Sequence, residues 1–180
     1  MDEETGLTGA FALKEGFMNG DILLNLDSED EGEIFIGCAG GVDTLATFRY
    51  KTEAAPEAHV FFRVRVSDLS GGHSGDDIDK GRMNSNKLVA RLLWNGAQRF
   101  GLRLSRFDGG NLRNAIPREA YAIFGVPVRF KDEFIKRYKL FAADLEAEFR
   151  LREPNFKITL NEMPQVDRVL DARTQFGLVY

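Results

Sequence analysis

The chain has 180 residues, enough for one domain with a sizeable core, and 43% of them are hydrophobic against 29% charged. Its net charge of -4 excludes the basic footprint of a protein that binds nucleic acid or an anionic membrane. No apolar run approaches the roughly 20 residues that span a bilayer, and the acidic start, Met1-Asp2-Glu3-Glu4, is unlike a secretory signal. Cys38 is the single cysteine and allows no internal disulfide, so we expect a reducing compartment, the cytoplasm.

The first 54 residues predict short pieces of α/β structure. A brief helix is expected between residues 6 and 13, and an apolar run between polar ends predicts a buried strand over residues 21–27. Residues 33–38 and 48–52 predict two more strands. We expect these pieces to belong to an incomplete domain that ends near residues 52–58.

From His59 onwards the pattern is regular. The predicted order is β-α-β-β-α-β, the ferredoxin-like unit in which two helices cover one face of a four-stranded antiparallel sheet. We expect the strands of the 60s and the 100s to pair, and a further helix to run from Val166 to Tyr180. The predicted strands are 59–66, 100–107, 120–126 and 156–160, and the predicted helices are 84–97 and 131–150.

Three carboxylates near the start of the chain could serve a metal site. Glu3 and Glu4 are adjacent, so one can bind an ion while its neighbour acts as general base to a metal-bound water. Asp27 ends an apolar run, where functional carboxylates gather in an open α/β sheet. The alternatives are a solvated terminus or acidic helix cap for the glutamates, and a turn-forming aspartate for Asp27.

Two loops of the second half carry candidate site residues. Residues 71–75 are glycine and serine around His73, which is presented at the tip and can donate a hydrogen bond to a developing oxyanion. In the loop 109–118, Arg113 or Arg118 could hold a carboxylate and Asn114 could orient an amide. The alternatives are a flexible loop with an incidental histidine and a hairpin turn with solvated polar groups.

Seven motifs follow one another along the chain. They are residues 2–10 (DEETGLTGA), 25–33 (NLDSEDEGE), 37–41 (GCAGG), 69–75 (LSGGHSG), 80–82 (KGR), 84–88 (NSNKL) and 112–119 (LRNAIPRE). Together they resemble the aminoacyl-histidine dipeptidases, a family of co-catalytic zinc peptidases. The similarity covers nearly the whole chain and weakens after about Arg150. A local departure is Asp79, where many members carry histidine.

The resemblance implies a zinc-dependent dipeptidase with two zinc ions. Glu3 matches the family's general base, Glu4 a ligand of one zinc ion and Asp27 a ligand of the other. His73 matches the lid histidine that stabilises the tetrahedral oxyanion, and Asn114 a lid residue near the C-terminal end of the substrate. A metal-bridging water, activated by the glutamate, attacks the peptide carbonyl of Xaa-His or another dipeptide.

The resemblance also implies a domain organisation. Residues 1–54 would be part of the zinc-peptidase catalytic domain, 55–164 the ferredoxin-like lid domain, and 165–180 the start of the remaining lid. Through the lid, two copies could form a homodimer. The dipeptide substrate is the expected small-molecule partner, and no nucleic acid or membrane is expected.

Most of the family's zinc ligands have no counterpart in this chain. The family places a His-x-Asp motif and a bridging aspartate before the glutamate pair, and another histidine ligand towards its C-terminus. We therefore expect an internal segment of the enzyme that is inactive alone, because Glu4 and Asp27 cannot complete a zinc site. The alternative function is a non-catalytic ferredoxin-like binding or dimerisation module; its negative charge disfavours an RNA-binding version.

Overall fold

The computed structural model describes residues 6–24, 31–37, 42 and 44–179, in two units that divide after Arg49. The first unit contains the short helix α1 (Thr8–Phe11), inside the predicted 6–13 span. The strands predicted over 21–27 and 33–38 are wrong for the residues that the structure describes, 21–24 and 33–37, which lie in no strand. Their apolar side chains are exposed, fully so at Ile36, and a strand needs a neighbour both for its backbone hydrogen bonds and for its apolar face.

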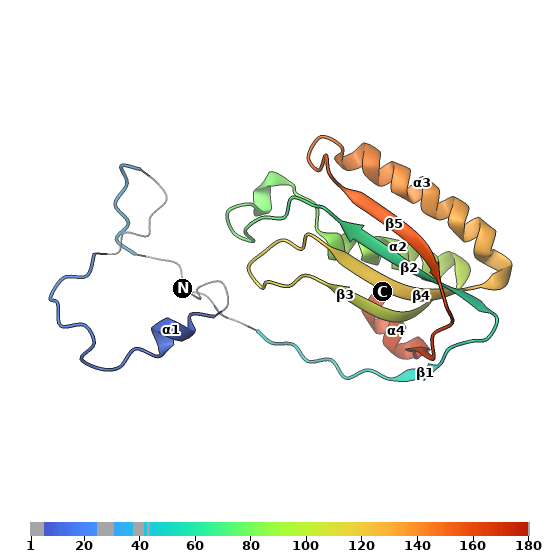
Figure 1. Ribbon diagram of the computed structural model, residues 1–180, viewed down its shortest axis with the longest axis horizontal. Helices are drawn as coiled ribbons and strands as arrows, with labels where there is room; N and C mark the ends of the chain where they lie inside the picture. Colours follow the sequence, from blue (N-terminus) through green and yellow to red (C-terminus); the bar gives the residue numbers. More distant parts are fainter. Residues whose placement is uncertain (1–5, 25–30, 38–41, 43, 180) are drawn as a thin grey trace. The chain divides into compact units, whose positions relative to one another are not determined.

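The second unit is built on a four-stranded antiparallel sheet. Its strands are β2 (His59–Ser67), β3 (Arg103–Gly109), β4 (Ala120–Pro127) and β5 (Lys157–Met163). They lie side by side in the order β3-β4-β2-β5 (Figure 1). Along the chain, the helix α2 (Ser85–Phe100) connects β2 to β3, and the helix α3 (Lys131–Phe149) connects β4 to β5. The predicted ferredoxin-like βαββαβ order is therefore confirmed.

The expected pairing of the 60s strand with the 100s strand is wrong. β4 lies between them and is antiparallel to both, with Phe62 opposite Phe124 and Leu104 opposite the same residue. The helix that connects β2 to β3 returns the chain in the same direction, so the two strands are parallel to each other. In an antiparallel sheet two parallel strands need a third strand between them.

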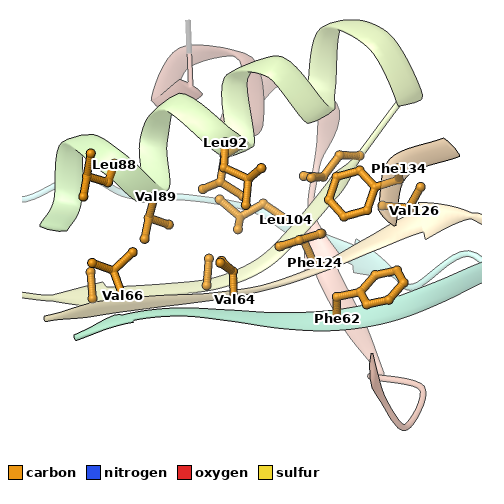
Figure 2. Close-up of a cluster of buried hydrophobic side chains, with 14 of the residues drawn as sticks. Phe62, Val64, Val66, Leu88, Val89, Leu92, Leu104, Phe124, Val126 and Phe134 are labelled. Carbon is orange, nitrogen blue, oxygen red and sulfur yellow. The ribbon is translucent and has the colours of Figure 1, made fainter. Parts of the chain in front are cut away.

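Both helices pack on one face of this sheet. The alternation in β2 buries Phe62, Val64 and Val66 beneath the helices, while Arg63 and Arg65 are exposed on the opposite face. Figure 2 shows these strand side chains pointing towards the buried residues of α2. Phe134 of α3 enters the same core, 5.7 Å from the ring of Phe62 and 5.5 Å from that of Phe124.

The chain after the sheet differs from the single predicted helix. Residues Arg168–Leu170 form a strand, β6, which pairs antiparallel with β1 (Thr52–Ala54), and the helix α4 (Ala172–Val179) follows it. Val169 is fully buried. A distant segment, β1, therefore supplies the strand partner that makes residues 168–170 a strand instead of part of the predicted helix. β1 itself begins where the predicted 48–52 strand was expected to end.

Candidate functional site

The residues 68–84 that connect β2 to α2 form a folded loop rather than a free turn. Gly71 and Gly72 have φ angles of +67° and +142°, which favour glycine. Each also lies against a side chain: a Cβ on Gly71 would reach within 2.7 Å of Arg118 Cδ, and one on Gly72 within 2.8 Å of Asp77 Cβ. The two glycines are needed both for the backbone conformation and for these close approaches.

His73 lies in this loop with a half-exposed side chain, 49% accessible. Its Nδ1 accepts hydrogen bonds from the backbone N–H groups of Gly75 at 3.1 Å and Asp76 at 3.3 Å. The carboxylate of Asp76 lies 3.7 Å from the same nitrogen. Because Nδ1 accepts from these two N–H groups, the geometry favours the tautomer whose proton sits on Nε2. His73 can therefore offer Nε2–H as a hydrogen-bond donor.

Asp77 holds the backbone of the loop at His73. Its Oδ2 accepts from the His73 N–H at 2.7 Å, and its Oδ1 accepts from Lys80 Nζ at 2.6 Å. The Arg82 guanidinium lies 3.1 Å from the same carboxylate and also donates to Gly71 O at 2.6 Å. The hydrogen bond from Lys80 and then that from the His73 N–H lower the pKa of Asp77. The carboxylate is thus the centre of a charged network under His73.

Asn114 lies beside His73 through the backbone. Ser74 N–H donates to Asn114 O at 2.8 Å, and Ile116 N–H donates to Gly72 O at 2.8 Å. These two bonds flank an antiparallel bridge between His73 and Ala115. The structure therefore brings together two loops that the sequence singled out separately.

Two further contacts join the loops. Arg118, one of the two arginines considered for carboxylate binding, donates from Nε to Leu69 O at 3.1 Å. Ser85 N–H, at the start of α2, donates to Pro117 O at 3.1 Å. At least one guanidinium nitrogen of Arg118 thus helps to hold the 109–118 loop against the loop of residues 68–84.

A buried glutamate was missed by sequence reasoning. Glu153, just after α3, is 2% exposed, and its two carboxylate oxygens accept from Ser70 N–H at 2.7 Å and Met83 N–H at 3.0 Å. A single acidic residue between Arg152 and Pro154 reads as solvated, because charged side chains at helix ends usually face water. These two contacts become visible only in the fold, which places Glu153 between Ser70 and Met83.

The other three predicted site residues, Glu3, Glu4 and Asp27, lie outside the described residues. Within the part of the chain that the structure describes, no group of three or more His, Cys, Asp and Glu side chains could hold a metal ion. The same part has no helix long and apolar enough to cross a membrane. His59, the second histidine, lies at the start of β2, away from the His73 loop, and burial followed by the nearby Arg103 charge lowers its pKa.

An apolar pocket of about 280 Å³ lies at a different place in the second unit. It is formed by α2, β3 and α4, and neither His73 nor Asn114 contributes to it. Its lining residues are Asn86, Lys87, Ala90, Leu93, Leu104, Phe107, Leu178 and Val179.

Comparison with known proteins shows that the chain is similar to a dipeptidase. No family model matches the chain. The cytosol non-specific dipeptidase of Escherichia coli (strain K12) is 39% identical over 175 residues, which cover 97% of this chain and 36% of that protein. Fold and sequence together thus relate the chain to dipeptidases.

The chain is also similar in fold and sequence to a solved dipeptidase structure. The aminoacylhistidine dipeptidase of Vibrio alginolyticus superimposes with a TM-score of 0.80 at 41% identity, over 99% of this chain and 36% of that one. The resemblance to aminoacyl-histidine dipeptidases inferred from the motifs is therefore confirmed along nearly the whole chain. The chain spans about a third of the length of each of these two relatives.

Proposed function

We propose that this chain contributes the lid and part of the catalytic domain of a zinc-dependent dipeptidase that hydrolyses Xaa-His and other dipeptides. The observation that carries the proposal is the setting of His73. Two backbone N–H groups occupy its Nδ1, so its Nε2–H can donate to an oxyanion from a half-exposed loop. The resemblance to dipeptidases over 97% of the chain supports the same activity.

The chain's own residues divide the work as follows. His73 donates from Nε2 to the carbonyl oxygen of the scissile peptide as negative charge develops there. Asn114, held beside it by the Ser74 N–H bond to its carbonyl, contacts the C-terminal end of the dipeptide. Glu3 would take the proton of the attacking water, and Glu4 and Asp27 would each be a ligand of one of the two zinc ions. Two zinc ions, when bound, would supply Lewis-acid polarisation of the carbonyl and a more acidic water.

The isolated chain is proposed to be inactive, because Glu4 and Asp27 alone cannot provide the three protein ligands that a catalytic zinc ion usually has. The test is a chimera in which this chain replaces the aligned segment of the Escherichia coli relative, compared with the chain alone. The chimera should cleave β-alanyl-histidine in the presence of zinc, and the chain alone should not. Zinc-dependent cleavage by the chain alone, or an inactive but folded, zinc-loaded chimera, would contradict the proposal.

Two neighbouring carboxylates provide a matched pair of variants in the chimera. Glu3→Gln should abolish turnover while leaving two zinc ions bound, since the general base is not a ligand. Glu4→Gln should lower the zinc content measured by elemental analysis. If both variants lose zinc to the same extent, the division of roles between Glu3 and Glu4 is wrong.

Cytoplasmic location and homodimer formation are part of the same proposal. The location is supported by the lone Cys38 and by the cytosolic name of the relative.

The dimer is supported by the edge of the sheet at β5, which ends the strand order and has no further strand beside it among the described residues. Light scattering after size exclusion should give twice the 20.2 kDa of one chain. A monomeric mass at high concentration would exclude the dimer.

A further inference from the structure

Glu153 links the two ends of the loop that carries His73. We define the His73 loop as residues 70–83. One carboxylate oxygen of Glu153 accepts from the N–H of Ser70, its first residue, and the other from the N–H of Met83, its last. These partners are 83 and 70 residues away in the sequence. A single side chain that follows the end of α3 thus joins the two ends of a loop that begins after β2 and ends before α2.

The environment of Glu153 makes this link rigid. The residue is 2% exposed, and a polar group buried to this extent is tolerated only when its oxygens are hydrogen-bonded. Its backbone is fixed as well, because Glu153 N–H donates to Phe149 O at 2.9 Å and Phe156 N–H donates to Glu153 O at 3.2 Å. The carboxylate is therefore held by α3, which is anchored in the core through Phe134 and Leu145.

The position of Met83 is transmitted to His73 through its neighbours in the loop. Arg82 precedes Met83, donates to Gly71 O at 2.6 Å and lies 3.1 Å from Asp77. Asp77 in turn accepts from the His73 N–H at 2.7 Å. From the other end, Ser70 is joined to His73 by only Gly71 and Gly72. Both routes from Glu153 converge on the backbone of His73.

We propose that Glu153 is a positioning residue, whose carboxylate closes the base of the His73 loop and so fixes where His73 presents its Nε2–H. This inference rests on the proposed function of His73. Glu153 has both oxygens occupied by backbone donors, so it acts through His73 and makes no contact with substrate. An apolar side chain of similar size would fill the space but would leave the Ser70 and Met83 N–H groups without these acceptors.

The first test uses the 180-residue chain and needs no catalysis. Glu153→Gln replaces one acceptor oxygen by a donor, so one of the two loop ends loses its bond. Nitrogen chemical shifts of the His73 ring should then move away from the single Nε2–H tautomer, and hydrogen exchange at Gly75 and Asp76 should accelerate at least tenfold. Glu148→Gln, an exposed change near the end of α3, should alter neither. Unchanged His73 ring shifts and exchange rates in a folded Glu153→Gln chain would overturn the inference.

Glu153→Asp provides a second variant if Glu153→Gln does not fold. It keeps the charge but shortens the reach, so it should retain the tautomer partly and give exchange rates between those of the parent and the glutamine variant. Exchange rates and ring shifts identical to those of the parent, despite loss of the Ser70 or Met83 bond, would overturn the inference by this route.

The second test is a double-mutant cycle in the dipeptidase chimera. Glu153→Gln should lower kcat roughly tenfold with little change in KM when His73 is present, and should have no further effect on kcat when combined with His73→Ala. An equal loss in both backgrounds would show that Glu153 does not act through His73. If the chimera has no activity, or if His73→Ala leaves turnover normal, the proposed function fails, and the ring-shift measurement decides the positioning function separately.

Discussion

His73 and Ala115 face each other in an isolated antiparallel bridge, so the backbone of the histidine lies beside the loop that carries Asn114. The bonds from Ser74 N–H to Asn114 O and from Ile116 N–H to Gly72 O, both 2.8 Å, close this bridge on each side. One consequence is that the two loops should behave as a unit. Disturbing either should change the surroundings of both candidate residues.

Gly72 is the position where a small change should disturb that unit most. We expect Gly72→Ala to lower the free energy of unfolding by more than about 2 kcal/mol, because an L-residue is strained at its φ and the added Cβ meets Asp77. The matched control is Gly101→Ala, which has a φ of +66° but no heavy atom within 4 Å of the new Cβ, and should cost about 1 kcal/mol. Urea unfolding measures both. Equal losses would show that neither the φ of Gly72 nor the contacts of the new Cβ with Asp77 and Arg82 add to the cost.

The second prediction about stability concerns Gln175, which covers the outer edge of β3. Gln175 of α4 accepts from Leu104 N–H at 2.8 Å and donates to Leu102 O at 2.7 Å, so its buried amide takes the place of a neighbouring strand. Gln175→Ala should destabilise the chain by about 2–4 kcal/mol, because two buried backbone groups lose their partners. Gln165→Ala removes an exposed bond to Pro56 O and should cost less than about 0.5 kcal/mol. Comparable losses in the two variants would contradict this account of the edge.

The network around Asp77 predicts an acid-dependent opening of the His73 loop. Because the hydrogen bonds from Lys80 and from the His73 N–H lower the pKa of Asp77, its contribution is complete above the ordinary aspartate pKa of about 3.9. It is lost as pH falls through the lower pKa of the folded state. Protection of the His73 N–H from hydrogen exchange, relative to the intrinsic rate at each pH, should therefore be lost only below about pH 4.

Two variants test whether Asp77 causes this change in hydrogen exchange at acid pH, which we call the acid limb. Asp77→Asn should give fast exchange at His73 already at neutral pH, since the acceptor charge is absent. Lys80→Met removes the largest cause of the lowered pKa and should shift the limb to higher pH. An acid limb that is the same in all three proteins would assign the effect to another group.

The fold of the second unit could be predicted because its signals are local. Alternation in β2 and the apolar stripes of α2 and α3 define each element without knowledge of its neighbours. Strand order was harder, since the position of β4 between β2 and β3 follows from crossover geometry and not from any one segment. β6 was misjudged for a related reason: residues 168–170 become a strand because β1, more than 100 residues earlier, pairs with them.

The site divides in the same way. His73 and Asn114 could be found because glycine-rich and polar loops are visible in the sequence. That the two residues lie close together could be seen only in the folded structure. Glu153 could not be found, because only tertiary structure turns a helix-end glutamate into a buried acceptor for Ser70 and Met83. Glu3, Glu4 and Asp27 stay predictions that rest on the motifs.

The proposed action of His73 on the oxyanion can be tested with the variant His73→Ala in the dipeptidase chimera. The chosen measurement is kcat for β-alanyl-histidine, with zinc content and melting temperature recorded on the same samples and His59→Gln as the control at the other histidine. His73→Ala should lower kcat roughly 10²- to 10³-fold at unchanged zinc content and melting temperature, because a donor whose hydrogen bond strengthens in the transition state is lost. Near-normal turnover in His73→Ala, or a loss of zinc that accompanies the loss of turnover, would contradict it.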